Sequence, residues 1–135
     1  MRMLLPLIAG SLVLGAAAAT AATPVDREAE LARALEGRVA GDPVDCIDLN
    51  RVRSTRVIND TAILYDAGRT IYVNRPRGGA DTLDRWDTLV TRLHSQRLCS
   101  IDTVQMIDPN SRMLSGIVFL GEFVPYRREA SAAAD

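Results

Sequence analysis

Three arginines follow a cysteine in the stretch CIDLNRVRSTR, residues 46–56. Guanidinium groups form paired hydrogen bonds with carboxylate or phosphate, so the stretch is a candidate anion site. In a strand, Arg51 and Arg53 lie on one face and Arg56 on the other, whereas in a helix Arg53 and Arg56 are neighbours. Neither geometry brings all three together. We therefore expect a solvated strand edge, neutralised by three nearby carboxylates: Asp45, Asp48 and Asp60.

The loop RPRGGAD, residues 75–81, is an alternative interaction site. Its two guanidiniums suit a carboxylate or phosphate, and a Gly-Gly pair lets backbone N–H groups approach an anion. No P-loop pattern accompanies the glycines, so the pattern is also typical of a plain loop. The candidate interaction residues are Arg75, Arg77, Gly78 and Gly79.

The chain has two cysteines, Cys46 and Cys99. In an oxidising compartment two cysteines in a small domain most often pair, and this bridge would close a loop that adds about 4 kcal/mol of stability in the chain-entropy model. A thiolate nucleophile or a zinc site is the alternative. With His94 as the sole histidine, the N/S ligands number three, one short of a structural zinc site. We expect a structural disulfide and no metal or cofactor.

No catalytic pattern emerges from the remaining polar residues. His94 has serines nearby but no G-x-S-x-G motif, and Glu122 could act with an aspartate such as Asp102 or Asp108 only if burial shifted a pKa. A small hydrolase using Glu122 or His94 is therefore the alternative to a non-enzymatic domain.

The N-terminus predicts export. Met1-Arg2-Met3 gives a positive start, LLPLIAGSLVLG is apolar, and Ala19-Thr20-Ala21 fits the small-residue cleavage pattern. We expect residues 1–22 to be a signal peptide, with Ala21 or Ala22 the last residue removed. A permanent anchor over residues 3–22 is the alternative, but its second half is only weakly apolar. The expected location is the periplasm or the medium, with no transmembrane segment after cleavage.

The charge of the chain argues against nucleic acid as a partner. Removing the signal peptide removes Arg2 and leaves 15 arginines against 17 acidic residues, with no lysine. Proteins that bind duplex nucleic acid usually present a strongly basic face.

Spacing and turn signals predict a mainly β (α+β) domain over residues 23–128: a small antiparallel sheet or barrel of five to seven strands behind one N-terminal helix. The helix covers residues 26–37, with Asp26 as its cap and Gly37 as its stop. Alternating β-branched and aromatic residues predict a strand at 54–58 and a hairpin with arms at 61–65 and 70–74. Single long strands are expected at 97–108 and 115–126, the second bent near Gly121. Residues 82–94 fit a helix or a strand, and we divide them into a helical turn at 82–86 and a strand at 88–93. Residues 129–135 are expected to be a disordered tail.

Several stretches resemble a family of small exported bacterial proteins, a domain of unknown function. They are RVAGDPVDCIDL, STRVINDTAILY, TIYVNRPRGGA, LCSIDTVQMID and GIVFLGEFVPYRR, which together cover most of residues 38–128. The resemblance implies export and one compact domain, favours a strand at 88–94, and brings no functional residues. Similar sequences often carry two further cysteines, near residues 80–83 and before the final LG-x-F. Their joint absence here implies that Cys46 and Cys99 pair. The expected function is a non-enzymatic exported domain that binds a protein or cell-envelope partner.

Overall fold

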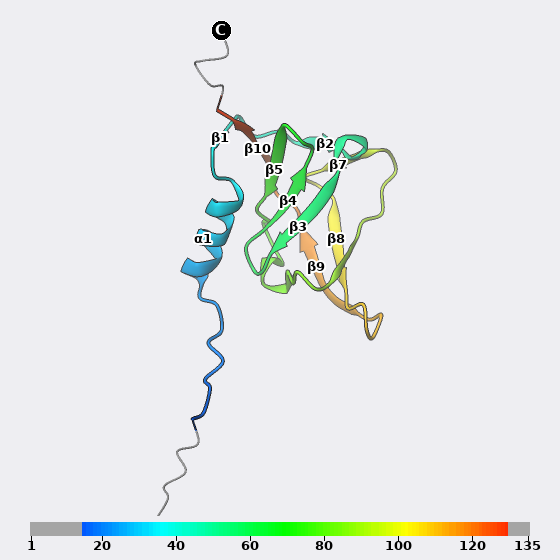
Figure 1. Ribbon diagram of the computed structural model, residues 1–135. Coiled ribbons are helices and arrows are strands. Elements are labelled where there is room, and N and C mark those ends of the chain that lie inside the picture. Colours follow the sequence, from blue (N-terminus) through cyan, green and yellow to red (C-terminus); the bar gives the residue numbers. More distant parts are fainter. Residues whose placement is uncertain (1–14, 130–135) are drawn as a thin grey trace, which may run out of the picture.

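The structure is a computed structural model that describes residues 15–129, in which one helix and ten strands form three antiparallel sheets (Figure 1). The helices, including two short 3-10 turns, are α1 (Pro24–Ala34), η1 (Leu49–Arg51) and η2 (Ala80–Thr82). The strands are β1 (Arg38–Ala40), β2 (Cys46–Asp48), β3 (Ser54–Ile58), β4 (Ala62–Asp66), β5 (Thr70–Asn74), β6 (Thr88–Val90), β7 (Arg97–Cys99), β8 (Thr103–Ile107), β9 (Leu114–Phe119) and β10 (Phe123–Arg128). In this part of the chain no helix is long and apolar enough to cross a membrane.

The largest sheet has the strand order β1-β10-β5-β4-β3. Strand β4, which lies between β5 and β3, is covered on both faces, because alternate side chains of a strand point to opposite sides. Ile63 and Tyr65 pack into one apolar cluster, and Ala62 and Leu64 pack into the other. A mainly β fold with one N-terminal helix is confirmed.

Helix α1 covers one face of the five-stranded sheet and the two smaller sheets cover the other (Figure 1). On the helix side, the buried Leu31 and Leu35 pack against apolar side chains of β3, β4 and β5. On the far side, the sheets β2-β7 and β6-β8-β9 contribute Leu98, Met106 and Val118 to the main core. The molecule therefore has three layers: helix α1, the five-stranded sheet and the two smaller sheets.

Helix α1 begins earlier than the sequence predicts. Its N-cap is Thr23, whose hydroxyl accepts from the Asp26 N–H, while the Asp26 carboxylate accepts from the Thr23 N–H at 3.0 Å. Asp26 is thus the third helical residue of a capping box and not the cap itself. These hydrogen bonds lower the pKa of Asp26, the backbone bond from Thr23 contributing most.

Each of the two long predicted strands is in fact two strands. With the short strands β1 and β2, residues 15–129 form ten strands against the expected five to seven. The first run breaks between β7 and β8, where the Asp102 carboxylate accepts from the Cys99 N–H at 2.7 Å and closes a turn. The second breaks between β9 and β10. There the side-chain amide of the fully buried Asn74 donates to the Gly121 carbonyl at 2.7 Å and accepts from the Gly121 N–H at 3.0 Å.

The other strand predictions agree more closely with the structure. The hairpin is formed by β4 and β5, and β3 pairs with β4 as the preceding strand. In the ambiguous segment the helical turn comes earlier, at Ala80–Thr82, and the strand β6 is shorter, at Thr88–Val90.

Cys46 and Cys99 face each other across the β2–β7 pair and are joined by a disulfide, with Cα atoms 4.0 Å apart. The bond links two strands that are 53 residues apart in the chain.

Two predictions concern residues that the structure does not describe. Residues 1–14 of the expected signal peptide and residues 130–135 of the expected disordered tail lie outside the described residues. At the expected cleavage site, Ala21 and Ala22 are exposed and precede the helix without regular secondary structure.

Candidate functional site

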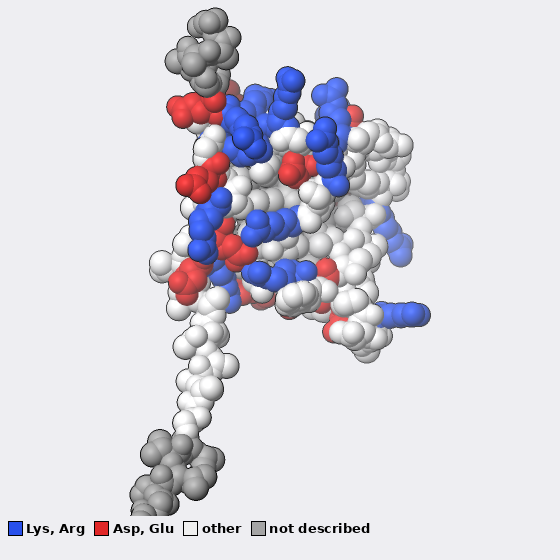
Figure 2. Space-filling model, viewed as in Figure 1, with Lys and Arg blue, Asp and Glu red and all other residues white. Residues whose placement is uncertain are grey.

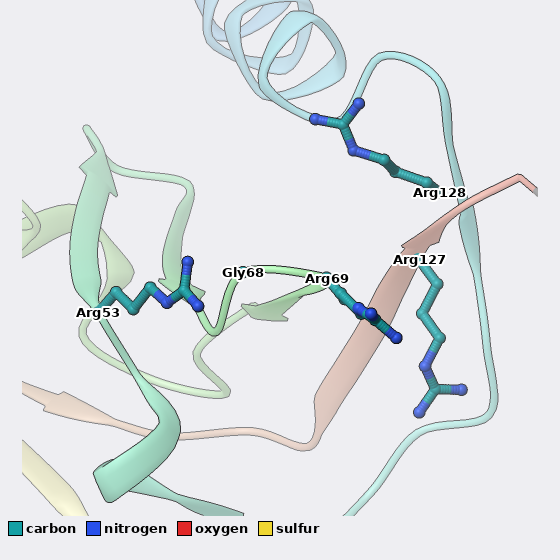
Figure 3. Close-up of a pocket in the computed structure, with 5 residues that line it drawn as sticks. All are labelled: Arg53, Gly68, Arg69, Arg127 and Arg128. Carbon is teal, nitrogen blue, oxygen red and sulfur yellow. The ribbon is translucent and has the colours of Figure 1, made fainter.

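Four arginines and a glycine line a cleft of about 660 Å³ at one end of the five-stranded sheet (Figure 3). Arg53 directly precedes β3, Gly68 and Arg69 form the β4–β5 turn, and Arg127 and Arg128 end β10. In Figure 2, basic side chains gather over this upper end of the molecule. We call this group the arginine cleft.

The β4–β5 turn forms the floor of the arginine cleft. The Asp66 carboxylate accepts from the Gly68 N–H at 2.7 Å, and the Ala67 N–H donates to the Thr70 carbonyl at 2.9 Å. Gly68 has a φ of +86°, a conformation that side chains other than glycine rarely adopt. A Cβ at this position would also lie 3.2 Å from the guanidinium carbon of Arg53. Glycine is therefore needed both for the turn and for the close approach of Arg53.

Arg38 on β1 links the β4–β5 turn to β10. Its guanidinium donates to the carbonyls of Arg69 at 3.0 Å, Tyr126 at 3.3 Å and Gly68 at 3.4 Å. The first and third belong to the turn and the second to β10. Arg38 is thus a positioning residue that fixes the backbone from which Arg69 and Arg127 project.

The two arginines that end β10 leave the strand on opposite sides, as alternation requires. Figure 3 shows Arg128 extending toward the end of α1, whereas Arg127 extends the other way, as Arg69 does. Arg128 also lies directly opposite Arg38 in the β1–β10 register. Like charges placed opposite each other in a sheet are destabilising, so this pairing adds electrostatic repulsion at this end of the sheet.

No carboxylate of residues 15–129 lies within 4.0 Å of the four cleft guanidiniums. Several arginines elsewhere are paired: Arg27 with Asp60 at 2.5 Å, Arg56 and Arg85 with Glu30 at 3.4 and 2.9 Å, and Arg75 with Glu28 at 2.8 Å. The nearest acid in the floor, Asp66, uses its carboxylate on the Gly68 N–H. Since guanidinium groups stay charged at physiological pH, the arginine cleft is a concentrated positive region on an acidic chain.

The three arginines of residues 46–56 lie in three different places. Arg56 pairs with Glu30 across to α1, Arg51 lies 3.8 Å from Asp48, and Arg53 joins the arginine cleft. Of the three carboxylates expected to neutralise these arginines, only Asp48 does so. Asp60 pairs with Arg27, and Asp45 accepts a hydrogen bond from Ser100.

The loop at residues 75–81 is more closely tied to the fold than expected. Both Arg75 guanidinium nitrogens bond the Glu28 carboxylate, at 2.8 and 2.9 Å, which raises the pKa of Arg75 and lowers that of Glu28. The loop backbone pairs with Phe119 of β9: the Arg77 N–H donates to the Phe119 carbonyl, and the Gly78 carbonyl accepts from the Phe119 N–H.

Gly79 is in the left-handed region at φ +76°, and a Cβ there would collide with the Ile117 carbonyl. These contacts explain the Gly-Gly pair as close packing against β9. Because the Arg77 N–H is already bonded and Arg75 is paired, the loop is not an open anion cradle. The Arg77 side chain is exposed, and its participation in an interaction stays a prediction.

The residues considered for hydrolysis are not assembled into a site. Glu122 and His94 are exposed, and neither has a side-chain hydrogen bond to another described residue. Asp102 accepts from the Cys99 N–H, and Asp108 accepts from the backbone of Ser111 and Asn110, which lowers the pKa of Asp108. The disulfide removes both thiols from zinc binding, and residues 15–129 contain no group of three His, Cys, Asp or Glu side chains placed to hold a metal ion.

Comparisons of the chain with protein-family models, with curated proteins and with solved structures found no match. The resemblance to a family of small exported proteins stays a prediction. The arginine cleft is therefore the feature of the described residues from which a function is inferred.

Sequence reasoning missed the arginine cleft because its members are far apart in the chain. Arg69 lies in a predicted hairpin turn, and Arg127 and Arg128 follow the last predicted apolar strand. None of the three looks like a binding residue from its local sequence. A signal was present: arginines flank three predicted strand ends. Only the strand order shows that these ends lie at the same edge of one sheet.

Proposed function

We propose that this protein is an exported, non-enzymatic binding domain whose arginine cleft captures an anionic component of the cell envelope. The observation that carries the proposal is that four arginines line one hollow and that no carboxylate of residues 15–129 lies within 4.0 Å of their guanidiniums. Arginine forks suit phosphate and carboxylate groups, and the volume falls in the range of small-ligand sites, about 300–1,000 Å³.

A contribution to the stability of the fold does not explain why four arginines lie together in the arginine cleft. Neighbouring like charges repel, and no carboxylate of residues 15–129 pairs with the four arginines of the cleft to offset that repulsion. A positive cluster that weakens the free protein is typical of a site whose partner supplies the opposite charge.

Two features support export. Residues 1–22 carry the pattern of a signal peptide, and the domain has a disulfide, which persists in oxidising compartments such as the periplasm and the extracellular medium. An envelope anion would meet the arginine cleft in either place. Intact mass of the protein recovered from an exporting host tests this part: loss of 21 or 22 residues is expected, and a full-length chain with free thiols contradicts it.

Retention on phosphocellulose tests the anion site. We compare the protein with two double variants that remove the same charge: Arg69→Ala/Arg127→Ala in the arginine cleft and Arg92→Ala/Arg97→Ala outside it. Exposed ion pairs contribute up to about 1 kcal/mol each, so the cleft variant should bind about tenfold more weakly in low salt.

The control variant should elute with the unaltered protein. Equal weakening of both variants would show that retention follows net charge only, and the proposal would fail. Circular dichroism of each variant establishes that the fold is intact before elution is compared.

A further inference from the structure

The arginine cleft lies across the strand ends of the five-stranded sheet. In the order β1-β10-β5-β4-β3, this edge holds the start of β1, the end of β10, the β4–β5 turn and the start of β3. Each of these four positions carries an arginine at or next to the strand end: Arg38, Arg128 with Arg127, Arg69 and Arg53. The cations therefore form a row that runs across the strands.

The strand spacing sets the length of this row. Neighbouring strands lie about 4.8 Å apart, so the three intervals from β10 to β3 extend over about 14 Å. A charge-assisted hydrogen bond needs a donor within about 2.7–2.9 Å of the anion oxygen. One small anion can thus meet the guanidiniums at one part of the row but not at both ends.

The side chains do not bend inward to compensate. Figure 3 shows the Arg53 guanidinium against Gly68 on one side of the turn, Arg69 and Arg127 extending together on the other, and Arg128 directed away toward α1. The Arg53 guanidinium lies beside the turn, where a Cβ at Gly68 would come within 3.2 Å of its carbon. Arg38 bonds three carbonyls, so it positions the row and does not receive the ligand.

We propose that the arginine cleft binds an extended polyanion, a flexible chain with repeated phosphate or carboxylate charges that crosses the strand ends from Arg53 to Arg128. The inference rests on the proposed function and adds to it the class of ligand. Separate short contacts along a row favour a chain that carries one charge to each arginine. Repeated attachment also raises affinity, because each further contact is intramolecular once the first has formed.

Isothermal titration with a phosphate series tests the length of the ligand. The probes are inorganic phosphate, pyrophosphate, tripolyphosphate and a long linear polyphosphate, added to the purified disulfide-bonded protein in low salt. The affinity, expressed per protein molecule, should increase with each longer probe, by at least tenfold from pyrophosphate to the long chain. The binding constant of the long chain should fall with salt with a log–log slope of about −3, which corresponds to four charges.

Variants at the ends and in the middle of the row separate the contacts. Arg53→Ala and Arg128→Ala should weaken the long chain about three- to tenfold and leave pyrophosphate nearly unchanged. Arg69→Ala and Arg127→Ala should weaken both probes. Arg92→Ala, which removes an exposed arginine outside the row, is the matched control and should change neither.

A polyglutamate chain of the same charge count distinguishes the two sources of charge. Tighter binding of polyphosphate indicates a phosphate-bearing polymer, and tighter binding of polyglutamate indicates a carboxylate polymer; both support an extended ligand. Equal affinity for pyrophosphate and the long chain, with Arg69→Ala still harmful, would overturn the extended ligand and leave the anion site. Absence of binding to every probe would overturn the proposed function as well.

Discussion

At the scale of single residues, the position of Gly68 determines where Arg53 lies. Gly37 offers a matched comparison, because it also has a positive φ, +75°, but a Cβ there would meet nothing within 4 Å. Alanine at either position forces an unfavourable backbone conformation, at about 1 kcal/mol or more. Only at Gly68 would the new methyl group displace the Arg53 guanidinium.

We therefore predict that Gly68→Ala and Gly37→Ala lower the free energy of unfolding to a similar degree. Only Gly68→Ala should also reduce affinity for a long polyphosphate, by about threefold, an effect like that of losing one exposed ion pair. Urea denaturation and calorimetric titration of the two variants check this. Unchanged polyphosphate affinity in Gly68→Ala would mean that Arg53 does not depend on the turn.

Single residues also show how far the sequence could be used for prediction. The hairpin around Gly68 was predictable, because β-branched and aromatic residues flank a glycine-containing turn. The role of Asn74 was not. Its amide bonds both backbone groups of Gly121, a residue 47 positions away, and nothing local distinguishes this asparagine from one in a surface turn.

At the scale of elements, α1 is attached by leucines and by ion pairs. Arg27, Glu28 and Glu30 each pair with a charged side chain of the sheet domain, at Asp60, Arg75 and Arg56, respectively. The predicted helix was correct in type, but these partners could not be predicted, because they depend on which loops lie beside the helix. The breaks within the two long apolar runs were missed for the same reason, since they are fixed by contacts distant in sequence.

The Glu28–Arg75 pair makes part of this attachment dependent on pH. The hydrogen bonds from Arg75 lower the pKa of Glu28 below its ordinary value of 4.5. A carboxyl whose pKa is lower in the folded state stabilises the fold above its unfolded pKa and loses that contribution as the pH falls through the folded value. Glu28→Gln should therefore destabilise the protein at pH 7 and leave it nearly unchanged well below the lowered pKa.

The effect should be on the order of 0.5 kcal/mol, because both side chains are more than half exposed. Urea denaturation at pH 7 and pH 3 measures it. Glu36→Gln is the control, since Glu36 is exposed and has no ion pair with a described residue. The same loss of stability at both pH values would indicate that Glu28 acts through packing and not through its charge.

The strand pair β2–β7 depends on the disulfide. Both strands are three residues long, and they form a sheet of their own. Closing the Cys46–Cys99 loop restricts the unfolded chain by about 4 kcal/mol in the entropy model. Cys46→Ala/Cys99→Ala should therefore lose a comparable free energy of unfolding in denaturant titrations. A loss below about 1 kcal/mol would contradict a stabilising role.

At the scale of the whole molecule, the fold converts a dispersed sequence feature into one charged end. The chain is slightly acidic overall, with a formal net charge of −1, yet strand order brings unpaired arginines to the same edge of the sheet. Spacing and turn signals correctly predicted a mainly β fold with one helix and gave no sign of this polarity. Net charge averages over the surface, whereas a ligand responds to local potential.

The most direct test of the arginine cleft is a map of backbone amide chemical shifts during titration with tripolyphosphate. The largest changes should fall on the turn from Ala67 to Thr70 and on Arg53, Arg127 and Arg128, and should disappear in Arg69→Ala/Arg127→Ala. If the largest changes fall instead on the loop at residues 75–81, or persist unaltered in that variant, the arginine cleft is not the anion site.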